Sequence, residues 1–506
     1  MNKIISYLND HSKVIAVIGI FLMCVSLFAT SQLAYMNSDN SWYAIMGKGI
    51  ANGNILLRDW IGSSLSHYFP YAVVEAFWAL FINSYRAIHA LSIVSLTAVF
   101  FTIVWFLLKI LLKETQSLLS ILSAVTIFIA IHPADMSDAY AHLAPMLITL
   151  MVVYLYYRRE TFDVKSKITI TALLGCWIDG YNYAYFLLPM IIENIFYCIK
   201  TKKFDTKIVW IFIGMLVFVL RHVIMKSFVI KVPGFPKSYY TTFIQYNELP
   251  GKLNRFYVCF IQLFSADFWG RKVFKAIPQI AFTVVMFFTM FLHFLYARRI
   301  VKEYDSDARN RLMLFILVSS FAVFGVDVFS TIFIHARYTV GIFVNSLILL
   351  CYWLNMEDEV HRFQTLIFLT LFALSVLYQK QQGRYRTDAR LKERRRIAKI
   401  LKREGLHRGY ATFGNALSTN FVANETIAAP INKFFAPLQW LSNQAVYSSS
   451  KFYFVMRWIS DGEWSDWDPS EEEVLDHFGN PVKTIDEGRV RIYIYDHDLS
   501  DKVQKP

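Results

Sequence analysis

Long stretches without charged side chains recur through the first three quarters of the chain. Each is close to the length that a helix needs to cross the roughly 30 Å hydrocarbon core of a bilayer. The pattern predicts eleven membrane-spanning helices, at residues 14–36, 87–108, 115–134, 139–157, 167–178, 181–198, 207–230, 276–297, 312–334, 338–356 and 363–379. The run at 167–178 is too short to cross alone, so the pattern also allows a re-entrant pair with the segment after Asp179.

Composition supports a membrane protein and excludes other classes. The 506 residues are 56% hydrophobic and 17% aromatic, which is too apolar for a water-soluble surface. The five cysteines lie mostly inside apolar runs without CxxC spacing, so they indicate small core residues. A net charge of +13 fits cytoplasmic loops and lipid headgroups. We therefore predict no nucleic-acid partner.

Lysine and arginine in the short loops predict the orientation. With a cytoplasmic N-terminus, the basic residues of five loops all lie inside, and the tail from residue 380 lies outside. The outer side then also contains residues 37–86, 135–138, 179–183, 231–275 and 335–337. Val14 to Met36 is longer than the apolar core of a signal peptide, so it is interpreted as a retained first span.

The tail divides into two parts. Residues 380–404 hold eleven Lys and Arg against three acidic residues, which is typical of a basic amphipathic helix able to lie along anionic headgroups. In residues 405–506 acidic residues exceed basic ones, 14 to 9, and short apolar runs alternate with turns. We predict a transmembrane module at 1–379, a basic connector at 380–404 and a small soluble α/β or α+β domain at 405–506.

Several polar residues that suit sugar transfer gather on the predicted outer side. Transfer from a lipid phosphate to a hydroxyl needs a carboxylate that accepts the proton and cations that hold the leaving phosphate. Asp39 and Asp138 are the candidate bases, and Arg337, His335 and Lys48 are the candidate phosphate ligands. The candidates for acceptor binding or for support of these groups are Asp59, Asp135, His142, Trp464 and Trp467.

Each candidate has a simpler interpretation. Asp39 also fits the N-cap of a helix, SWYAIMGKGIA, that rests on the membrane surface. Asp138 fits a solvated loop, and Arg337 fits an anchor among headgroups. Ionisable residues inside predicted spans either form internal pairs or line a channel, and we assign no catalytic role to them. These residues are Glu193, Arg221 and Asp327.

Trp464 and Trp467 lie among acidic residues in DGEWSDWD, a composition able to stack on and hydrogen-bond a glycan. Trp440 and Trp458 fit core packing instead. The segment lacks the spacing of a calcium loop. No P-loop, Rossmann, HExxH, CxxC or GxSxG motif appears, so we predict no bound nucleotide and no cofactor; a lipid-linked donor fits that absence.

The order of these motifs resembles the GT-C superfamily of polytopic glycosyltransferases that use polyprenyl-phosphate sugars. The resemblance rests on D-x-x-W-Y-x-x-x-G-x-x-I-x-x-G from Asp39, on RDW at 58–60, on the acidic loop at 132–142 and on HARY at 335–338. The character of the whole chain is similar to the bacteriophage-type O-antigen glucosyltransferases that convert bacterial serotype. This implies a mainly α, GT-C-type helix bundle with the C-terminal domain on the outer face.

The resemblance also implies an activity. The expected reaction is inverting transfer of a hexose, most simply glucose, from undecaprenyl phosphate to O-antigen or another surface polysaccharide at the periplasmic face of the bacterial inner membrane. Expected partners are the lipid-linked sugar, the polysaccharide acceptor, and a donor flippase and donor synthase. Asp39 would occupy the first-loop acidic position, and Asp138 or Asp135 the second.

The sequence departs from the family pattern in two ways, and two alternative functions stay open. No K-P-P-L segment follows RDW, so the usual first-loop lysine has no counterpart. The acidic metal pair of the oligosaccharyltransferase branch is not matched either, so we predict that the protein needs no metal. An O-antigen polymerase is one alternative, because the outer loop 231–275 contains Arg255 and Arg271. A flippase or transporter for lipid-linked glycans is the other, although no pair of related halves is visible.

Overall fold

The computed structural model places most of the chain and divides it into two compact units. Unit 1 comprises Met1–Leu27, Val94–Arg221 and Pro236–Tyr385, and unit 2 comprises Phe28–Ile93, His222–Phe235 and Arg386–Pro506. The residues that the structure describes are 2–34, 38–55, 57, 60–61, 71–112, 119–123, 126, 136–158, 162–176, 183–228, 242–331, 334, 339–356, 363–384, 386–424, 426–438, 442–448, 451–459 and 468–503.

Unit 1 is built from helices, and three of them, α2, α5 and α10, continue into unit 2. The helices are α1 (Asn2–Asp10), α2 (Ser12–Leu33), α5 (Tyr85–Leu111), α7 (Met136–Tyr157), α8 (Val164–Cys176), the π-helical turn η3 (Tyr183–Leu187), α9 (Leu188–Thr201), α10 (Ile208–Phe228), α11 (Leu249–Leu263), α12 (Val273–Glu303), α13 (Ala308–Phe329), α14 (Val340–Met356) and α16 (Gln364–Gln381). Each predicted span except 115–134 overlaps one of them. Most of 115–134 lies outside the described residues.

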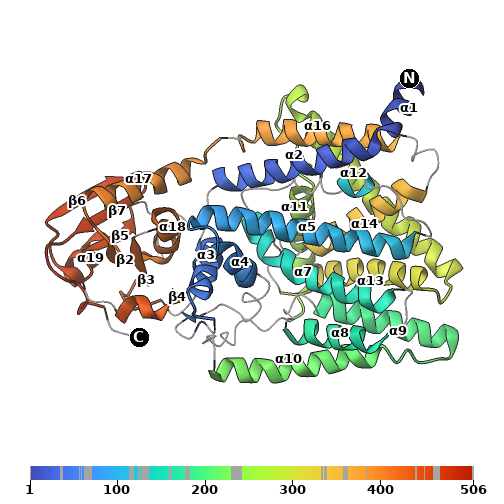
Figure 1. The fold of residues 1–506 in the computed structure, drawn as a ribbon, viewed down its shortest axis with the longest axis horizontal. Coiled ribbons are helices and arrows are strands. Elements are labelled where there is room, and N and C mark those ends of the chain that lie inside the picture. The colour runs from blue at the N-terminus through green and yellow to red at the C-terminus, as the bar shows by residue number, and fades with distance from the viewer. Residues whose placement is uncertain are drawn as a thin grey trace. The chain divides into compact units, whose positions relative to one another are not determined.

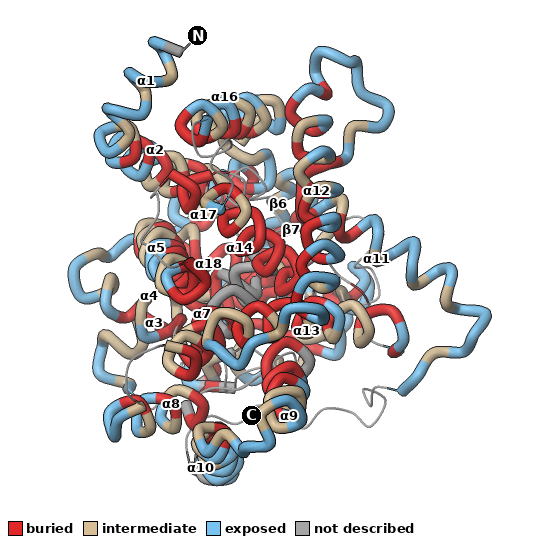
Figure 2. The backbone as a smooth tube through the Cα atoms, turned by 90° about the vertical axis from the view of Figure 1, so that its right-hand side faces the viewer, coloured by how far each residue is buried: buried red, intermediate tan, exposed pale blue. Residues whose placement is uncertain are grey.

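The helices have the surface of membrane-spanning segments. Within the described residues, four are long and apolar enough to cross a bilayer, namely α2, α5, α12 and α13. Large apolar side chains such as Val284, Phe291 and Phe294 on α12 are exposed, whereas α14 is buried along most of its length (Figure 2). Exposed apolar side chains along a helix suit contact with lipid. The chain is a multi-pass membrane protein, and the count of eleven spans stays a prediction.

Unit 2 contains the predicted C-terminal α/β domain. Its strands are β2 (Arg408–Thr412), β3 (Ile427–Ile431), β5 (Phe454–Trp458), β6 (Lys483–Glu487) and β7 (Val490–Ile494). They form one sheet in the order β3-β2-β5-β7-β6. Strand β2 runs parallel to β3 and β5, whereas β7 is antiparallel to β5 and β6. A mixed sheet with helices confirms the sequence prediction of a small α/β or α+β domain.

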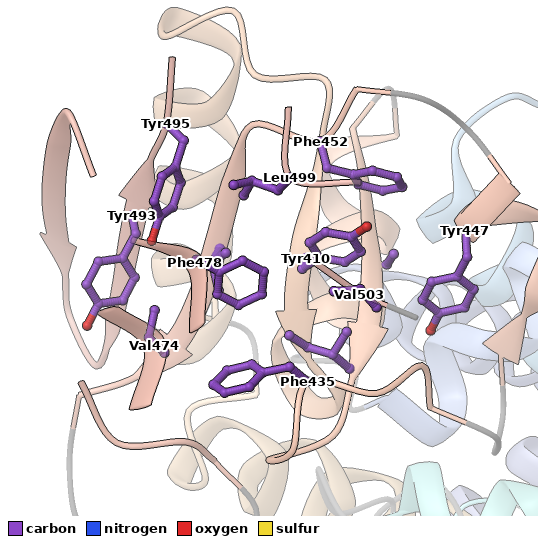
Figure 3. Close-up of a cluster of buried hydrophobic side chains, with 13 residues drawn as sticks. Tyr410, Phe435, Tyr447, Phe452, Val474, Phe478, Tyr493, Tyr495, Leu499 and Val503 are labelled. Carbon is purple, nitrogen blue, oxygen red and sulfur yellow. The ribbon is translucent and has the colours of Figure 1, made fainter. Parts of the chain in front are cut away.

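Helices cover both faces of this sheet, because the strands alternate their side chains between two cores. On β7, Tyr493 points into a cluster with Val474 and Phe478 of α19 (Glu471–Phe478), as Figure 3 shows. Ile492, one residue away, joins the opposite cluster with α17 (Ala389–Arg403) and α18 (Phe413–Ala423) (Figure 1).

Helix α17 is the basic amphipathic segment found in the sequence. Its Ile397 and Leu401 are fully buried against the sheet. The apolar face of α17 therefore packs on protein and not on lipid, which differs from the interpretation of a helix lying along headgroups. Only the charged face of α17 is left for other contacts.

The first outer loop belongs to the same unit as the C-terminal domain. Its helices are α3 (Ser38–Ala51) and α4 (Val73–Ala79), which pack on each other. Ala44, Ile88 and Phe421 form one buried cluster that joins α3 and α5 to α18. Strand β1 (Trp60–Ile61) pairs antiparallel with β4 (Ser442–Asn443). Unit 2 is thus assembled from segments more than three hundred residues apart, as the pairing of Trp60 with Asn443 shows.

Candidate functional site

Asp39 lies in the first turn of α3, which begins at Ser38. The predicted helix is confirmed, although Asp39 falls inside it and not before it. Trp42, Tyr43 and Met46 are each at most 1% exposed. The helix is therefore buried in protein along this face, and the interpretation of a helix resting on the membrane surface is corrected.

Aromatic contacts fix the position of α3. The ring of Trp42 lies edge-on to Trp60 with centroids 5.8 Å apart, and Tyr43 lies 4.7 Å from Tyr71. Trp60 is the last residue of RDW, so the two parts of the first-loop motif contact each other through Trp42 and Trp60.

A buried acid and a buried histidine connect α4 to α5. Glu75 Oε1 lies 2.7 Å from His89 Nδ1, and the two side chains are 0% and 1% exposed. The His89 ring also meets Phe421 of α18 edge-on at 6.0 Å. Carboxylate–imidazole pairs can move protons, but burial separates this pair from any substrate. We interpret it as the contact that holds α4 on α5. Sequence reasoning missed it, although Glu75 interrupts an apolar run, VVEAFWAL.

Lys48 lies at the other end of α3 from Asp39. Nine residues of helix separate the two, which is about 13 Å along the axis. The Lys48 Nζ donates to the carbonyl oxygen of Asn83 at 3.4 Å and lies 4.8 Å from the centre of the Tyr85 ring. These contacts anchor the end of α3 beside the start of α5. A role of Lys48 in phosphate binding stays a prediction.

The second acidic loop begins a helix. Asp138 and His142 fall in the first two turns of α7, which starts at Met136. Asp39 belongs to unit 2 and Asp138 to unit 1. Several candidates lie outside the described residues, namely Asp59, Asp135, His335, Arg337, Trp464 and Trp467.

Unit 1 has a charged cluster at the C-terminal end of α13 that the sequence only partly indicated. Asp327 is 3% exposed and interacts electrostatically with Lys252 of α11. Burial and the neighbouring charge of Arg255 hold the pKa of Lys252 below its ordinary value. Two cations three residues apart share a helix face and can attract a phosphate. Asp327 was noticed as a charge within a span, but its partner Lys252 on α11 was not.

The other buried charge noticed in the sequence has a structural role. Glu193 of α9 accepts from Arg311 Nε of α13 at 2.6 Å. Arg311 Nη1 also contacts Asp205 at 2.6 Å, and Tyr157 donates to Glu193 at 3.0 Å. A buried charge whose partners satisfy it in this way is a packing contact between helices. The pairing favours the internal-pair interpretation of Glu193 over a channel.

The described residues contain no group of three or more His, Cys, Asp or Glu side chains that could bind a metal ion. Metal independence stays a prediction, because several acidic candidates lie outside the described residues.

Comparison with known proteins shows a similarity in structure but not in sequence. No protein-family model and no curated protein matches the chain. In fold, the chain is similar to solved oligosaccharyltransferases. An oligosaccharyltransferase of Archaeoglobus fulgidus, solved with zinc and sulfate, has a TM-score of 0.50 and 12% identity over 90% of this chain and 71% of its own. The archaeal oligosaccharyltransferase AglB, solved with an inhibitory peptide and a dolichol-phosphate, has a TM-score of 0.48 and 11% identity over 89% and 70%.

At 12% identity the likeness concerns the fold alone. It extends over 90% of the chain, so it includes both the helical part and the C-terminal domain. The expected architecture, a bundle of helices with a small C-terminal domain, is therefore supported. The resemblance to serotype-converting enzymes has no counterpart in these comparisons.

Proposed function

We propose that the protein is an inverting membrane glycosyltransferase that moves a hexose from undecaprenyl phosphate to a surface polysaccharide. The observation that supports this most directly is the fold shared with an oligosaccharyltransferase over 90% of the chain. Asp39, in the first turn of the first helix after the first apolar span, adds a candidate base to that fold. Glucose as the sugar and O-antigen as the acceptor follow from the sequence resemblance.

The proposed chemistry is a displacement at C1 of the sugar. The acceptor hydroxyl attacks C1 from the face opposite to the phosphate, and its proton passes to the carboxylate of Asp39 or Asp138. The C1–O bond to the phosphate breaks, and the lipid phosphate leaves with the bonding electrons. Cations stabilise the charge that gathers there. Arg337 and His335 are the proposed cations.

The proposed setting is the periplasmic face of the bacterial inner membrane. The apolar helices support a lipid-embedded enzyme, and an outward C-terminal domain would meet the polysaccharide. A donor synthase and a donor flippase would supply the lipid-linked hexose on that face. No step of this reaction uses a nucleotide bound to this chain.

The test uses the full chain in lipid nanodiscs, with undecaprenyl-phosphate glucose carrying a radiolabel and purified O-polysaccharide as acceptor. Wild-type protein should label the polysaccharide, and Asp39→Asn should lower the rate by about a hundred-fold or more, the usual contribution of a general base. Asp10→Asn is the matched control, because Asp10 is an exposed acid at the end of α1.

Other outcomes identify other functions. Wild-type rates in Asp39→Asn would remove the base role from Asp39 and turn attention to Asp138. Longer O-polysaccharide without added label would indicate a polymerase. Label that crosses the bilayer without transfer would indicate a transporter. Each of the last two would overturn the proposed activity.

A further inference from the structure

Helix α11 lies where α13 ends and α14 begins. Phe256 of α11 contacts Phe324, in the last two turns of α13, with ring centroids 4.9 Å apart. Phe264, directly after α11, contacts Phe343 in the first turn of α14, also at 4.9 Å. Because these contacts lie at neighbouring helix ends, α11 crosses the ends of α13 and α14 and does not run alongside them.

The chain before α11 is held at the same level. Phe243 forms an isolated β-bridge with Ser330, the residue after α13. The amide of Ile244 donates to the carbonyl oxygen of Phe329 at 3.1 Å. Helix α13 ends here and α12 begins nearby in the chain, at Val273; both are apolar enough to cross a bilayer. The ends of such spans lie near the lipid headgroups, so α11 lies at that level too.

Beside its protein-facing side, α11 carries an exposed apolar stripe. The side that faces the protein contains the buried residues Cys259, Phe260 and Leu263. Leu253, Tyr257 and Ile261 follow one another at intervals of four residues, so they form a single stripe along the helix. Leu253 and Tyr257 are 43% and 46% exposed, and Ile261 is half-buried. The protein itself therefore leaves much of this stripe uncovered.

The third side of α11 is mainly polar. Its exposed residues include Asn254, Arg255 and Gln262, with Val258 as an apolar residue among them. The helix thus has protein on one side, an apolar stripe on the second and polar groups on the third. This is the arrangement of a helix that lies in the plane of a membrane surface, between acyl chains and water.

Aromatic side chains on both flanks of α11 are strongly exposed. Phe243 and Tyr246 precede the helix, and Trp269 and Phe274 follow it. Tryptophan and tyrosine are favoured at the interface between membrane and water. Phe274 is the second residue of α12, so this surface continues into the exposed apolar side of that span. Figure 2 shows α11 at the margin of the bundle.

We propose that the segment from Phe243 to Phe274 binds the bilayer surface, with α11 lying in its plane. The stripe of Leu253, Tyr257 and Ile261 faces the acyl chains, and the polar side faces water. Lipid is the partner because the exposed surface is continuous with the lipid-facing side of α12. The phosphate of a lipid-linked donor would lie at the same level, but neither this surface nor its test depends on the proposed sugar transfer.

The depth of Trp269 is measured by fluorescence quenching, with the full chain in nanodiscs that hold one chain each. The lipid is phosphatidylcholine, either unmodified, brominated near the headgroup or brominated near the chain ends. The difference between wild type and Trp269→Phe gives the Trp269 signal. Bromine near the headgroup should quench most of this signal, and bromine near the chain ends should quench less. Trp458→Phe is the control, because Trp458 lies on β5 of the C-terminal domain and its signal should not be quenched.

Iodide in the water phase separates the other possible surroundings of Trp269. Quenching by iodide without quenching by brominated lipid would place Trp269 in water and overturn the proposal. Protection from iodide that appears only in discs with two chains would assign the surface to a second copy of the chain and overturn it as well.

Two substitutions on α11 test which side faces lipid. Leu253 and Val258 are both 43% exposed, so Leu253→Asp and Val258→Asp remove equally exposed apolar side chains. Leu253→Asp should raise hydrogen exchange in residues 249–263 in nanodiscs by about ten-fold, because a charge is costly among acyl chains. Val258→Asp should leave exchange unchanged, and Leu253→Met, which stays apolar, should keep the wild-type protection. Equal exchange in the two aspartate variants would show that the stripe does not face lipid.

Discussion

At the scale of single residues, Gly47 determines how closely α3 lies against α4. A Cβ atom at Gly47 would fall 2.4 Å from Glu75 Cβ and 2.8 Å from the backbone nitrogen of Ala76. Both distances are shorter than carbon and nitrogen atoms tolerate, and one of the neighbours is backbone. The helices would therefore have to move apart, which would also pull Glu75 away from His89.

Gly47→Ala is expected to destabilise unit 2 by about 1–3 kcal/mol, the usual cost of forcing extra volume into a packed contact. The measurement is the melting temperature of the purified full chain in detergent. Gly251→Ala is the control, because nothing lies within 4 Å of a Cβ atom at Gly251 on α11. Equal melting temperatures for the two variants would show that α3 and α4 do not need this close approach.

The sequence predicted the helix at Asp39 but not what surrounds it. The charged residue, the aromatic pair and the spaced glycines are features of the local sequence, so they can be recognised without the structure. The contact of Glu75 with His89 and the burial of Trp42 depend on which helices meet. No periodicity distinguishes a tryptophan that faces lipid from one that faces a neighbouring helix. The sequence therefore predicted which residues to consider for the site, but not how those residues are arranged in space.

At the scale of elements, the sheet of the C-terminal domain places an acid at the carboxyl ends of its parallel strands. Asp468 lies near Thr412 at the end of β2 and Trp458 at the end of β5. Burial raises the pKa of Asp468 to about 6, against the opposing effect of the Thr412 hydroxyl and of Arg457. The unfolded chain would hold this proton only up to about pH 3.8.

The raised pKa predicts how stability depends on pH. Between about pH 4 and pH 6 the folded state keeps the Asp468 proton and the unfolded state releases it, so stability falls as pH rises, by at most about 3 kcal/mol. Asp468→Asn should remove that decrease. Melting temperature against pH checks this, with Asp501→Asn, an exposed acid, as control. Parallel curves for wild type and Asp468→Asn would contradict a buried, protonated Asp468.

The strands illustrate what the pattern of elements can predict. The alternation in GRVRIYIYD predicted a strand, and β7 runs from Val490 to Ile494. Alternate side chains of β7 lie in two different hydrophobic clusters, one on each face of the sheet. The order β3-β2-β5-β7-β6 was not predictable, because strand order depends on which edges meet and on the crossovers between them. Likewise, two residues of the first loop, Trp60 and Ile61, pair with β4, and their short run indicates no strand.

At the scale of the whole molecule, contacts join segments that the sequence analysis assigned to different parts of the chain. The expected boundaries at 379 and 404 follow changes of composition along the chain. The contacts instead group Phe28–Ile93 with Arg386–Pro506. The residues that join them, Ala44, Ile88 and Phe421, are ordinary apolar residues of three helices. Composition reports where a chain leaves the membrane, but it does not report which outer segments fold together.

Phe421 offers a test of this assembly. It is 2% exposed, and its ring lies 6.4 Å from Tyr85 and 6.0 Å from His89. Phe421→Ala should cost about 3–5 kcal/mol as a buried phenylalanine truncation, and the loss falls on the contact between α18 and the first loop. Hydrogen exchange should therefore increase in peptides that cover α3, 38–51, because α3 packs on α18.

Phe478→Ala is the matched truncation within the C-terminal domain, since Phe478 is 1% exposed in the cluster around α19. It should raise hydrogen exchange in the strands and leave α3 protected. If both variants raised exchange in α3 equally, the C-terminal domain would be coupled to the first loop only through general loss of stability. If Phe421→Ala left α3 protected, the first loop would hold its fold alone. A specific response of α3 to Phe421 would mean that a change in the C-terminal domain reaches the turn that contains Asp39.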